Sequence, residues 1–160
     1  MVNYSLGGGD YPFAGLGLTL SRTLNKGNTM LGVGAHYIGN TITDNYQGFD
    51  ELQYFPIMVD IRQKFNQSKN DRFATYVIFD GGYVVSISSN NTDEIGEYEY
   101  LNGWAINPGL SFRFNVFNNI GVMMDITWFH HWGPREWLPP FGYRDVKTWD
   151  LAMIRWSAFF

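Results

Sequence analysis

The sequence predicts an all-β protein, an up-and-down antiparallel transmembrane β-barrel of eight strands, and three observations support this fold class. Hydrophobic residues recur at every second position along most of the chain, the segments between these stretches are alternately short and long, and helical spacing is nowhere convincing. Residues 54–65 show the pattern most clearly, with Phe55, Ile57, Val59 and Ile61 on one face of an extended strand. The opposite face carries Met58, Asp60, Arg62 and Lys64.

The composition suits one domain, residues 1–160, and excludes several kinds of function. A net charge of -4 argues against a nucleic-acid surface, which requires clustered lysine and arginine. The chain has no cysteine, so neither disulfides nor cysteine-based zinc sites are expected. No apolar run approaches the roughly 18 residues of a transmembrane helix. We expect no metal and no other cofactor.

Strands in the first half of the chain are predicted by alternating hydrophobic residues. They are expected at residues 2–6, 13–24, 29–38 and 54–65, with connections at 7–10, 25–28 and about 40–51. The first strand is the shortest and is ended by consecutive glycines. The connection at 25–28 is a tight-turn signal in which Gly27 is expected at positive φ. The connection at 40–51 is long and polar.

Strands in the second half follow the same rule. They are expected at residues 72–86, 100–116, 120–132 and 147–160, with connections at 66–71, 87–99, 118–119 and 133–146. Short and long connections alternate along the whole chain. In an up-and-down barrel this places all tight turns at one end and all long loops at the other, an asymmetry typical of outer-membrane barrels.

The hydrophobic face is expected to point outward, towards lipid. An eight-stranded barrel has an interior only just wide enough for side chains, and the large apolar residues of eight strands would overfill it. The opposite face is rich in glycine, alanine and serine and carries charges of both signs, which suits a narrow lumen. Aromatic residues near the predicted strand ends resemble interfacial girdles: Tyr37, Tyr54, Phe65, Phe73, Tyr100, Trp104, Trp128, Trp149 and Phe160.

The chain resembles the small eight-stranded outer-membrane barrels of the OmpA and OmpX type. The likeness is architectural, and its most specific part is the last strand, where Ile154, Trp156 and Ala158 alternate and Phe160 is terminal. In such barrels this pattern is the signal read by the barrel assembly machinery. The resemblance implies an integral protein of the outer membrane of a diderm bacterium, surrounded by lipid and lipopolysaccharide.

The predicted lumen carries a network of opposite charges: Asp60, Arg62, Lys64, Asp80, Arg113, Asp125 and Arg155. A structural plug that satisfies buried charges is the favoured interpretation, because a barrel of this size leaves little aqueous channel. The alternative is a narrow pore or proton path along the same residues.

His130 and His131 are the weak candidates for catalysis. Outer-membrane lipid A deacylases and palmitoyl transferases place a histidine and a serine near the outer leaflet, so an esterase-like site is conceivable here. Such chemistry requires a nucleophile, a base and an orienting acid within hydrogen-bond reach. Adjacent histidines point to opposite faces of a strand, no serine motif is nearby, and His36 on another strand is the one companion the sequence suggests.

The segment after the histidines is dense in aromatic and proline residues. We weigh an aromatic girdle that continues into a packed loop against a protein-binding loop. The residues expected at such an interface are Trp132, Trp137, Leu138, Phe141 and Tyr143.

The function expected from the sequence is therefore non-enzymatic, that of a structural or accessory barrel which binds a larger envelope complex through its long extracellular loops. Two alternatives remain: an outer-membrane hydrolase or acyltransferase that modifies lipid A, and a narrow pore. Fold alone does not decide among them, because one scaffold hosts many activities.

Overall fold

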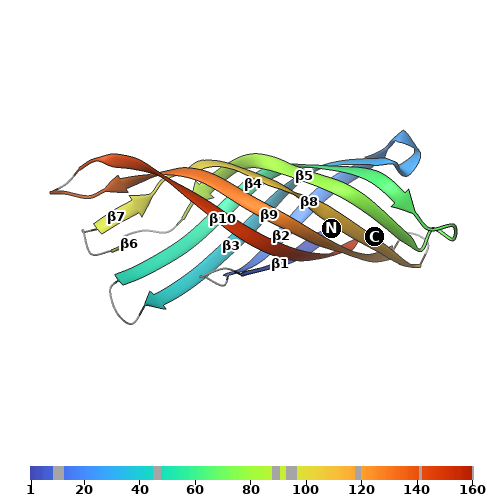
Figure 1. Ribbon diagram of the computed structural model, residues 1–160, viewed down its shortest axis with the longest axis horizontal. Coiled ribbons are helices and arrows are strands. Elements are labelled where there is room, and N and C mark those ends of the chain that lie inside the picture. The colour runs from blue at the N-terminus through green and yellow to red at the C-terminus, as the bar shows by residue number, and fades with distance from the viewer. Residues whose placement is uncertain are drawn as a thin grey trace.

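The computed structural model describes residues 1–8, 13–44, 48–87, 91–92, 97–117, 120–140 and 142–159 (Figure 1). Its strands are β1 (Val2–Gly8), β2 (Phe13–Leu24), β3 (Thr29–Asp44), β4 (Gly48–Gln67), β5 (Phe73–Ser86), β6 (Asn91–Thr92), β7 (Glu97–Tyr100), β8 (Gly103–Phe117), β9 (Ile120–Trp137) and β10 (Arg144–Phe159). A single 3-10 turn, η1 (Asn25–Gly27), joins β2 to β3, and Gly27 has the expected positive φ, 91°. Within the described residues, no helix is long and apolar enough to cross a membrane.

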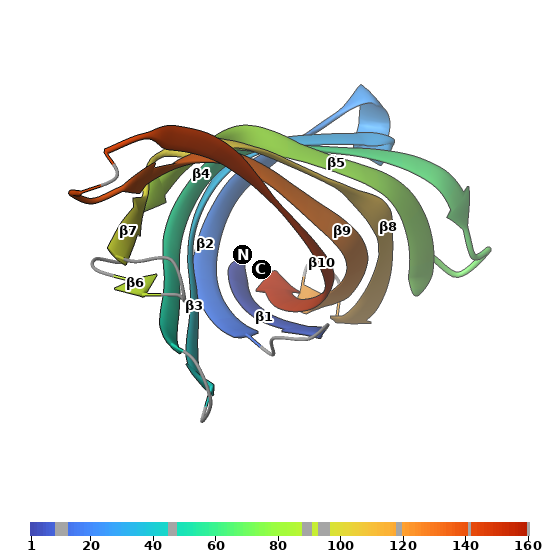
Figure 2. The ribbon, with the colours of Figure 1, turned by 60° about the vertical axis from the view of Figure 1, so that its left-hand side comes forward.

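The strands form one antiparallel ladder that returns to its starting point. Neighbours along the chain pair in the order β1-β2-β3-β4-β5-β8-β9-β10, and β10 also pairs with β1. Figure 2 shows these strands curving around a common axis. The short β7 pairs with the far end of β9, and β6 pairs with β7. The predicted all-β, up-and-down antiparallel barrel is thus confirmed, with eight strands in its closed ladder among the described residues.

The two ends of the barrel differ as the connection lengths predict. The short connections β2–β3, β4–β5 and β8–β9 lie together at one end, here called the turn end, and the other connections lie at the loop end (Figure 1). The loops themselves are shorter than expected, because the strands continue into them. β3 and β4 pair as far as Asp44 with Gly48, and β9 and β10 as far as Glu136 with Arg144. Backbone pairing there satisfies hydrogen bonds that a loop would leave to water.

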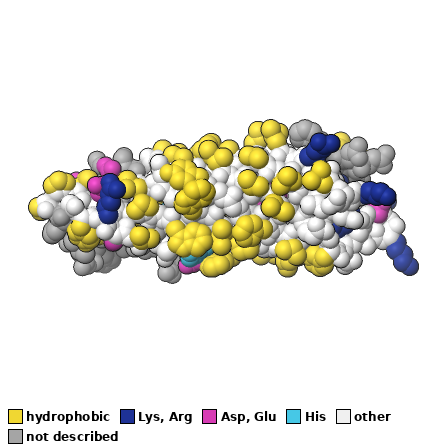
Figure 3. All heavy atoms as spheres, turned by 90° about the horizontal axis from the view of Figure 1, so that it is seen from above, with side chains coloured by type: hydrophobic (Ala, Val, Ile, Leu, Met, Phe, Trp, Pro, Cys, Tyr) yellow, Lys and Arg dark blue, Asp and Glu magenta, His cyan; other side chains and the backbone are white. Residues whose placement is uncertain are grey.

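The apolar face points outward, as predicted. Large hydrophobic side chains such as Leu20, Val33, Phe65 and Trp104 are more than half exposed on the outer wall. Figure 3 shows hydrophobic side chains over the middle of the barrel, with lysine and arginine side chains towards its two ends. Two residues assigned to the girdle lie inside instead, since Tyr54 and Tyr100 are each 4% exposed.

The interior is filled by side chains in three layers. A layer of buried charges lies at mid-height. An aromatic layer lies on its loop side and is formed by Ile38, Tyr54, Met58, Val84, Tyr98, Tyr100, Ala105, Phe129, Trp137 and Met153. A smaller layer lies on its turn side and is formed by Met30, Ala74, Tyr76 and Met123, with Met1 and Phe159 packed against it.

Candidate active site on the outer wall

The outer wall formed by β8, β9 and β10 is almost entirely apolar. Its outward positions are the even-numbered residues of 104–116, 120–134 and 146–158. All of them are hydrophobic or proline except His130, Thr148 and Asp150. These three polar side chains are not scattered. His130 pairs with Asp150 across the β9–β10 ladder, and Thr148 lies two residues before Asp150, opposite Trp132.

His130 and Asp150 form a hydrogen-bonded dyad. The distance between His130 Nδ1 and Asp150 Oδ1 is 2.5 Å. Because a carboxylate only accepts hydrogen bonds, Nδ1–H donates the hydrogen bond to Asp150, and in the neutral form of the ring Nε2 is then an acceptor. This arrangement fixes the orientation and tautomer of the ring, as the acid does for the histidine of a catalytic triad. The dyad is half of a nucleophilic site, with a base and the acid that orients it.

Two tryptophans on the same face of β9 enclose the imidazole. The ring centroid of His130 lies 4.2 Å from that of Trp132 and 5.2 Å from that of Trp128. The His130 side chain is 15% exposed, whereas that of Asp150 is 51% exposed. On the other side of β9, Ile106 pairs with His130. The base is therefore held in a stiff aromatic and aliphatic frame, while the carboxylate remains accessible.

The dyad lies near the loop-end edge of the apolar wall. The outward residues of β9 are apolar from Ile120 to Pro134 except for His130, and within this run the eleven residues from Val122 to Trp132 end at a tryptophan, a residue type typical of the membrane interface. A strand needs about 9–11 residues to cross the hydrocarbon core of a bilayer. On this scale Trp132 marks the loop-end boundary and His130 lies one outward position inside it.

His131 occupies a different environment from its neighbour. It is 1% exposed, points into the barrel, and lies 4.9 Å from Tyr54 between ring centroids. Among the described residues, neither of its ring nitrogens has a hydrogen-bond partner, so it lacks an orienting acid. His36, suggested as a companion, is also buried inside, so the barrel wall separates it from His130. Of the two candidate histidines, only His130 has the partner that catalysis requires.

Five of the seven predicted luminal charges meet inside the barrel. Arg62 binds both oxygens of Asp60 through Nε at 2.9 and 3.1 Å, and donates from Nη1 to Asp125 at 2.9 Å. Arg155 donates from Nε to the second Asp125 oxygen at 2.8 Å and pairs with Asp80 at 2.9 Å. The side chains of these residues are at most 4% exposed. Charges buried this deeply require such partners.

Lys64 and Arg113 do not join this cluster, which corrects the sequence expectation. Lys64 Nζ donates to Gln67 at 2.6 Å near the exposed β4–β5 turn. The Arg113 guanidinium lies 4.3 Å over the ring of Phe159 and donates to Asn115 at the turn end. Both residues have the inward parity of the cluster, but they lie towards the turn end of their strands, where the lumen opens.

The predicted partner-binding loop is largely a pair of strands. Trp132 belongs to the outer wall, whereas Trp137 is 1% exposed and packs inside against Tyr98 at 5.1 Å. Leu138 is half-buried, and Tyr143 is exposed but stacks on Trp137 at 5.7 Å. Phe141 lies outside the described residues. Trp137 is thus part of the aromatic interior and presents no surface to a partner, whereas Trp132 and Tyr143 are exposed.

An ion pair between Arg135 on β9 and Asp145 on β10 joins the two strands at the loop end of the barrel. Arg135 binds Asp145 through both Nε and Nη2, and its guanidinium lies 4.4 Å over the ring of Trp137. The hydrogen bond to Asp145 raises the pKa of Arg135 above its ordinary value. The β9–β10 hairpin is thus held rigid beyond the dyad.

The residues of the predicted assembly signal lie on the outer wall. Ile154 and Trp156 are exposed there, and Ala158 shares their face. Phe160 lies outside the described residues.

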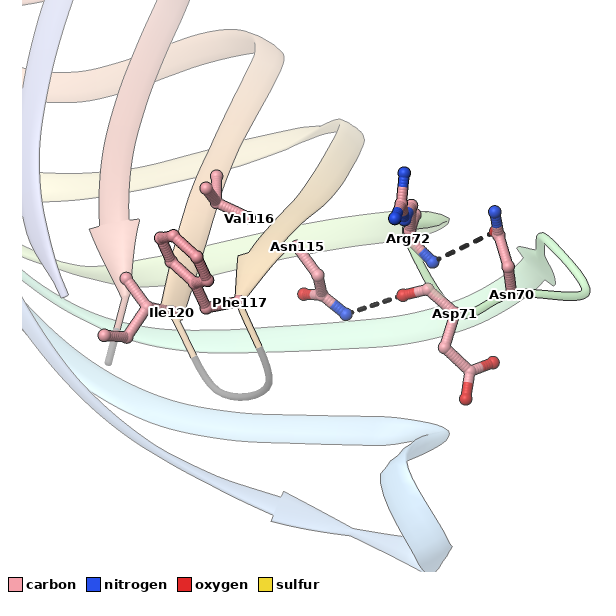
Figure 4. A pocket seen from close by; sticks show the side chains of 7 residues that line it. All are labelled: Asn70, Asp71, Arg72, Asn115, Val116, Phe117 and Ile120. Atoms are coloured by element: carbon pink, nitrogen blue, oxygen red, sulfur yellow. Dashed lines mark hydrogen bonds between the residues drawn. The ribbon is translucent and has the colours of Figure 1, made fainter.

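A hollow lined by described residues lies far from the dyad, at the turn end. It has a volume of about 830 Å³ and lies between two turns (Figure 4). Asn70, Asp71 and Arg72 line it on one side, and Val116, Phe117 and Ile120 on the other. Asn115 joins the two sides by donating to the Asp71 carbonyl oxygen at 2.6 Å. It is an open basin in which the described residues place no histidine, so it offers no comparable base.

Asp150 and Thr148 were missed by the sequence reasoning, although a signal for them was present. In the last strand both have the same parity as Ile154 and Trp156, so both had to face outward with the hydrophobic set. The same argument applies to His130 beside Trp128. An ionisable residue on a lipid-facing position is rare and is a functional-site candidate in its own right.

Comparison with known proteins supports the fold. No protein-family model matches the sequence, and no curated protein sequence matches it. Among solved structures, the chain is similar to the outer membrane enzyme PagL, with a TM-score of 0.61, 10% sequence identity, and coverage of 97% of this chain and 96% of that one. At this identity the likeness shows the fold alone, an outer-membrane β-barrel over nearly the full length of the chain.

The expectation of a non-enzymatic structural subunit is corrected by these findings. A barrel with this fold can be an enzyme, as PagL is, and the proposed contact residue Trp137 is buried. The enzyme alternative fits the fold and the dyad better than the accessory role does.

Proposed function

We propose that this chain is an integral outer-membrane enzyme that modifies lipid A by acyl-ester chemistry: a hydrolase that cleaves one of its acyl esters, or an acyltransferase that moves an acyl group from the ester of another lipid to lipid A. The observation that carries the proposal is the His130–Asp150 dyad, a base with its orienting acid on an otherwise apolar outer wall. The likeness to the outer membrane enzyme PagL supports it. We also propose that the chain shares its barrel architecture with the small barrels of the OmpA and OmpX type.

The position of the dyad agrees with a lipid substrate. In outer-membrane barrels the long loops are extracellular, so the loop-end edge of the wall meets the outer leaflet. A lipid in that leaflet reaches an outward-facing site by lateral movement, without entering the filled lumen. Its ester bonds lie near the boundary between headgroup and hydrocarbon, which is the level marked by Trp132. Lipid A is the acylated lipid that the outer leaflet supplies in quantity.

The chemistry follows from the tautomer of His130. Its Nε2 accepts a proton from the attacking hydroxyl group, and the imidazolium that forms is stabilised by Asp150. The protonated ring then donates the proton to the departing alkoxide of the ester. The surrounding tryptophans exclude water and lower the local dielectric constant, which strengthens the interaction between imidazolium and carboxylate.

The partners proposed for this chain are those of its membrane. Lipid and lipopolysaccharide would surround the outer wall. The barrel assembly machinery would insert the chain by reading Ile154, Trp156, Ala158 and Phe160 in the last strand.

The test is the lipid A mass profile of cells that overproduce the protein. We expect a new lipid A species lighter by one acyl group, or heavier by one if the acyl group is transferred to lipid A. His130→Gln should reduce its formation by about 10²–10⁴-fold, because a general base is lost.

His131→Gln is the matched control, since it alters the adjacent histidine on the inner face and should leave the profile as in the wild type. Both variants are checked for folding by the heat-dependent shift in gel migration that closed barrels show. An unchanged lipid A profile with well-folded wild-type protein would refute the proposed function.

A further inference from the structure

Thr148 is the third polar side chain of the wall, and the dyad alone gives it no role. It is exposed, lies on the outward face of β10 and precedes Asp150 by two residues. Across the ladder it faces Trp132, so it is the diagonal neighbour of His130. Diagonal neighbours in an antiparallel pair lie about 7–8 Å apart and remain within reach of long or aromatic side chains.

The surroundings give no structural reason for a hydroxyl at this position. The outward neighbours of Thr148 along β10 are Val146 and Asp150, and its partner across the ladder is Trp132. Among the described residues, no hydrogen bond holds the Thr148 hydroxyl. Thr148 lies opposite Trp132, at the loop-end edge of the apolar wall, which is the level at which the ester bonds of a lipid lie.

We propose that Thr148 is the nucleophile of this site and that the reaction passes through an acyl-threonine. The inference rests on the proposed function. A nucleophile, a base and an orienting acid are the three parts that covalent ester chemistry requires, and Thr148, His130 and Asp150 are the three polar residues of the wall.

The first half of the reaction transfers the acyl group to the protein. His130 Nε2 takes the proton of Thr148 Oγ1 as that oxygen bonds to the ester carbonyl carbon. The carbonyl electron pair moves to its oxygen and returns as the bond from the carbonyl carbon to the alcohol oxygen breaks. The leaving alkoxide takes the proton from His130.

The second half releases the acyl group. A water molecule, or the hydroxyl of a second lipid, loses its proton to His130 and attacks the acyl-threonine. Thr148 Oγ1 leaves and recovers that proton. Water scarcity at the wall favours a resident hydroxyl over water for the first attack, because Pro134 and Val146 continue the apolar surface on the loop side of the dyad.

The experiment is covalent labelling of the full-length barrel in detergent with a fluorophosphonate, followed by mass spectrometry of its peptides. We expect one probe adduct on the peptide that contains residue 148. Thr148→Val, which keeps the shape of the side chain, should take up no probe and should lose turnover about 10³-fold or more, while Thr148→Ser should restore both. His130→Gln should slow labelling in parallel with turnover.

The matched control is Thr127→Val on β9, because Thr127 is buried inside and its hydroxyl has no hydrogen-bond partner among the described residues. It should be labelled like the wild type. If Thr148→Val keeps its turnover while His130→Gln loses it, the nucleophile is water, and the role of Thr148 is refuted although the enzyme function stands. Labelling of Thr148 without any change in lipid A would instead support the nucleophile and refute lipid A as substrate. No adduct at residue 148 in the wild type refutes the proposal.

Discussion

Neighbouring residues of one strand have opposite environments in this barrel, and this decides what each can do. His130 and His131 are chemically identical, yet one faces the outer wall beside Asp150 and the other the closed interior. Arg62 and Lys64 share one face of β4, but only Arg62 lies deep enough to join the buried charges. The role of a residue therefore depends on its parity and on its height along the strand.

The carboxylate of the dyad should be tested separately from the base. Asp150→Asn keeps a side chain of the same shape but loses the charge that stabilises the imidazolium, so formation of the modified lipid A should fall by about 10²–10⁴-fold. Glu136→Gln is the control, because Glu136 also faces outward on the β9–β10 pair but binds Arg144 at the loop end, at 2.8 Å. Equal turnover of the two variants would contradict the role of Asp150.

The buried guanidinium of Arg62 should contribute strongly to the unfolding free energy of the barrel. Arg62→Met would leave Asp60 without its main partner and Asp125 with Arg155 alone, and breaking a buried pair in this way costs about 3–5 kcal/mol of unfolding free energy. Urea unfolding in lipid vesicles measures the loss. Lys64→Met, on the same face of β4 but only half-buried and outside the cluster, should change the stability by only about 0.5 kcal/mol. Equally small losses of unfolding free energy in the Arg62→Met and Lys64→Met variants would show that the buried charge cluster does not stabilise the barrel.

At the scale of the element, β9 combines three tasks along one strand. Its outward residues form the apolar wall, its inward residues supply Asp125 to the charge cluster and Phe129 to the aromatic layer, and its loop-end part extends beyond the wall to Trp137. Strict alternation makes this combination possible, because a shift of one residue would exchange the two faces. The dyad forms where the wall of β9 meets that of β10.

The destabilisation caused by a charged residue on the outer wall should depend on its depth in the bilayer. Ile126→Arg lies near the middle of the eleven-residue apolar stretch and should destabilise the barrel in vesicles by about 2–4 kcal/mol. Ile120→Arg lies at the turn-end edge of the same wall and should cost about 0–1 kcal/mol. Refolding into vesicles of fixed thickness measures both. Equal costs at the two depths would mean that this surface does not face hydrocarbon.

At the scale of the whole molecule, the filled interior separates this barrel from a pore. Charged side chains bridge the lumen at mid-height, and aromatic side chains occupy it towards the loops. The activity that such a barrel can offer must then lie on its outside. This agrees with a dyad on the wall and with a substrate that is itself part of the membrane.

The pore alternative can be tested directly. We expect no stepwise conductance from the purified barrel in a planar bilayer at high salt, because the three layers of side chains leave no continuous aqueous path. Insertion is verified by the heat-dependent gel shift of the recovered protein. Regular conductance steps in the wild type that change with Arg155→Ala would contradict this prediction.

The sequence by itself determined the fold class, the direction of the apolar face and the two unlike ends, because these follow from side-chain alternation and connection length, which are local properties. It also identified Asp60, Arg62, Asp80, Asp125 and Arg155 as luminal, since parity alone assigns them. Only the tertiary structure decided that Lys64 stays outside that cluster and that Trp137 turns inward. It also decided that Asp150, twenty residues after His130, lies directly opposite it. Register between strands and the length of pairing beyond the wall depend on how the whole barrel closes, and no local pattern in the sequence contains that information.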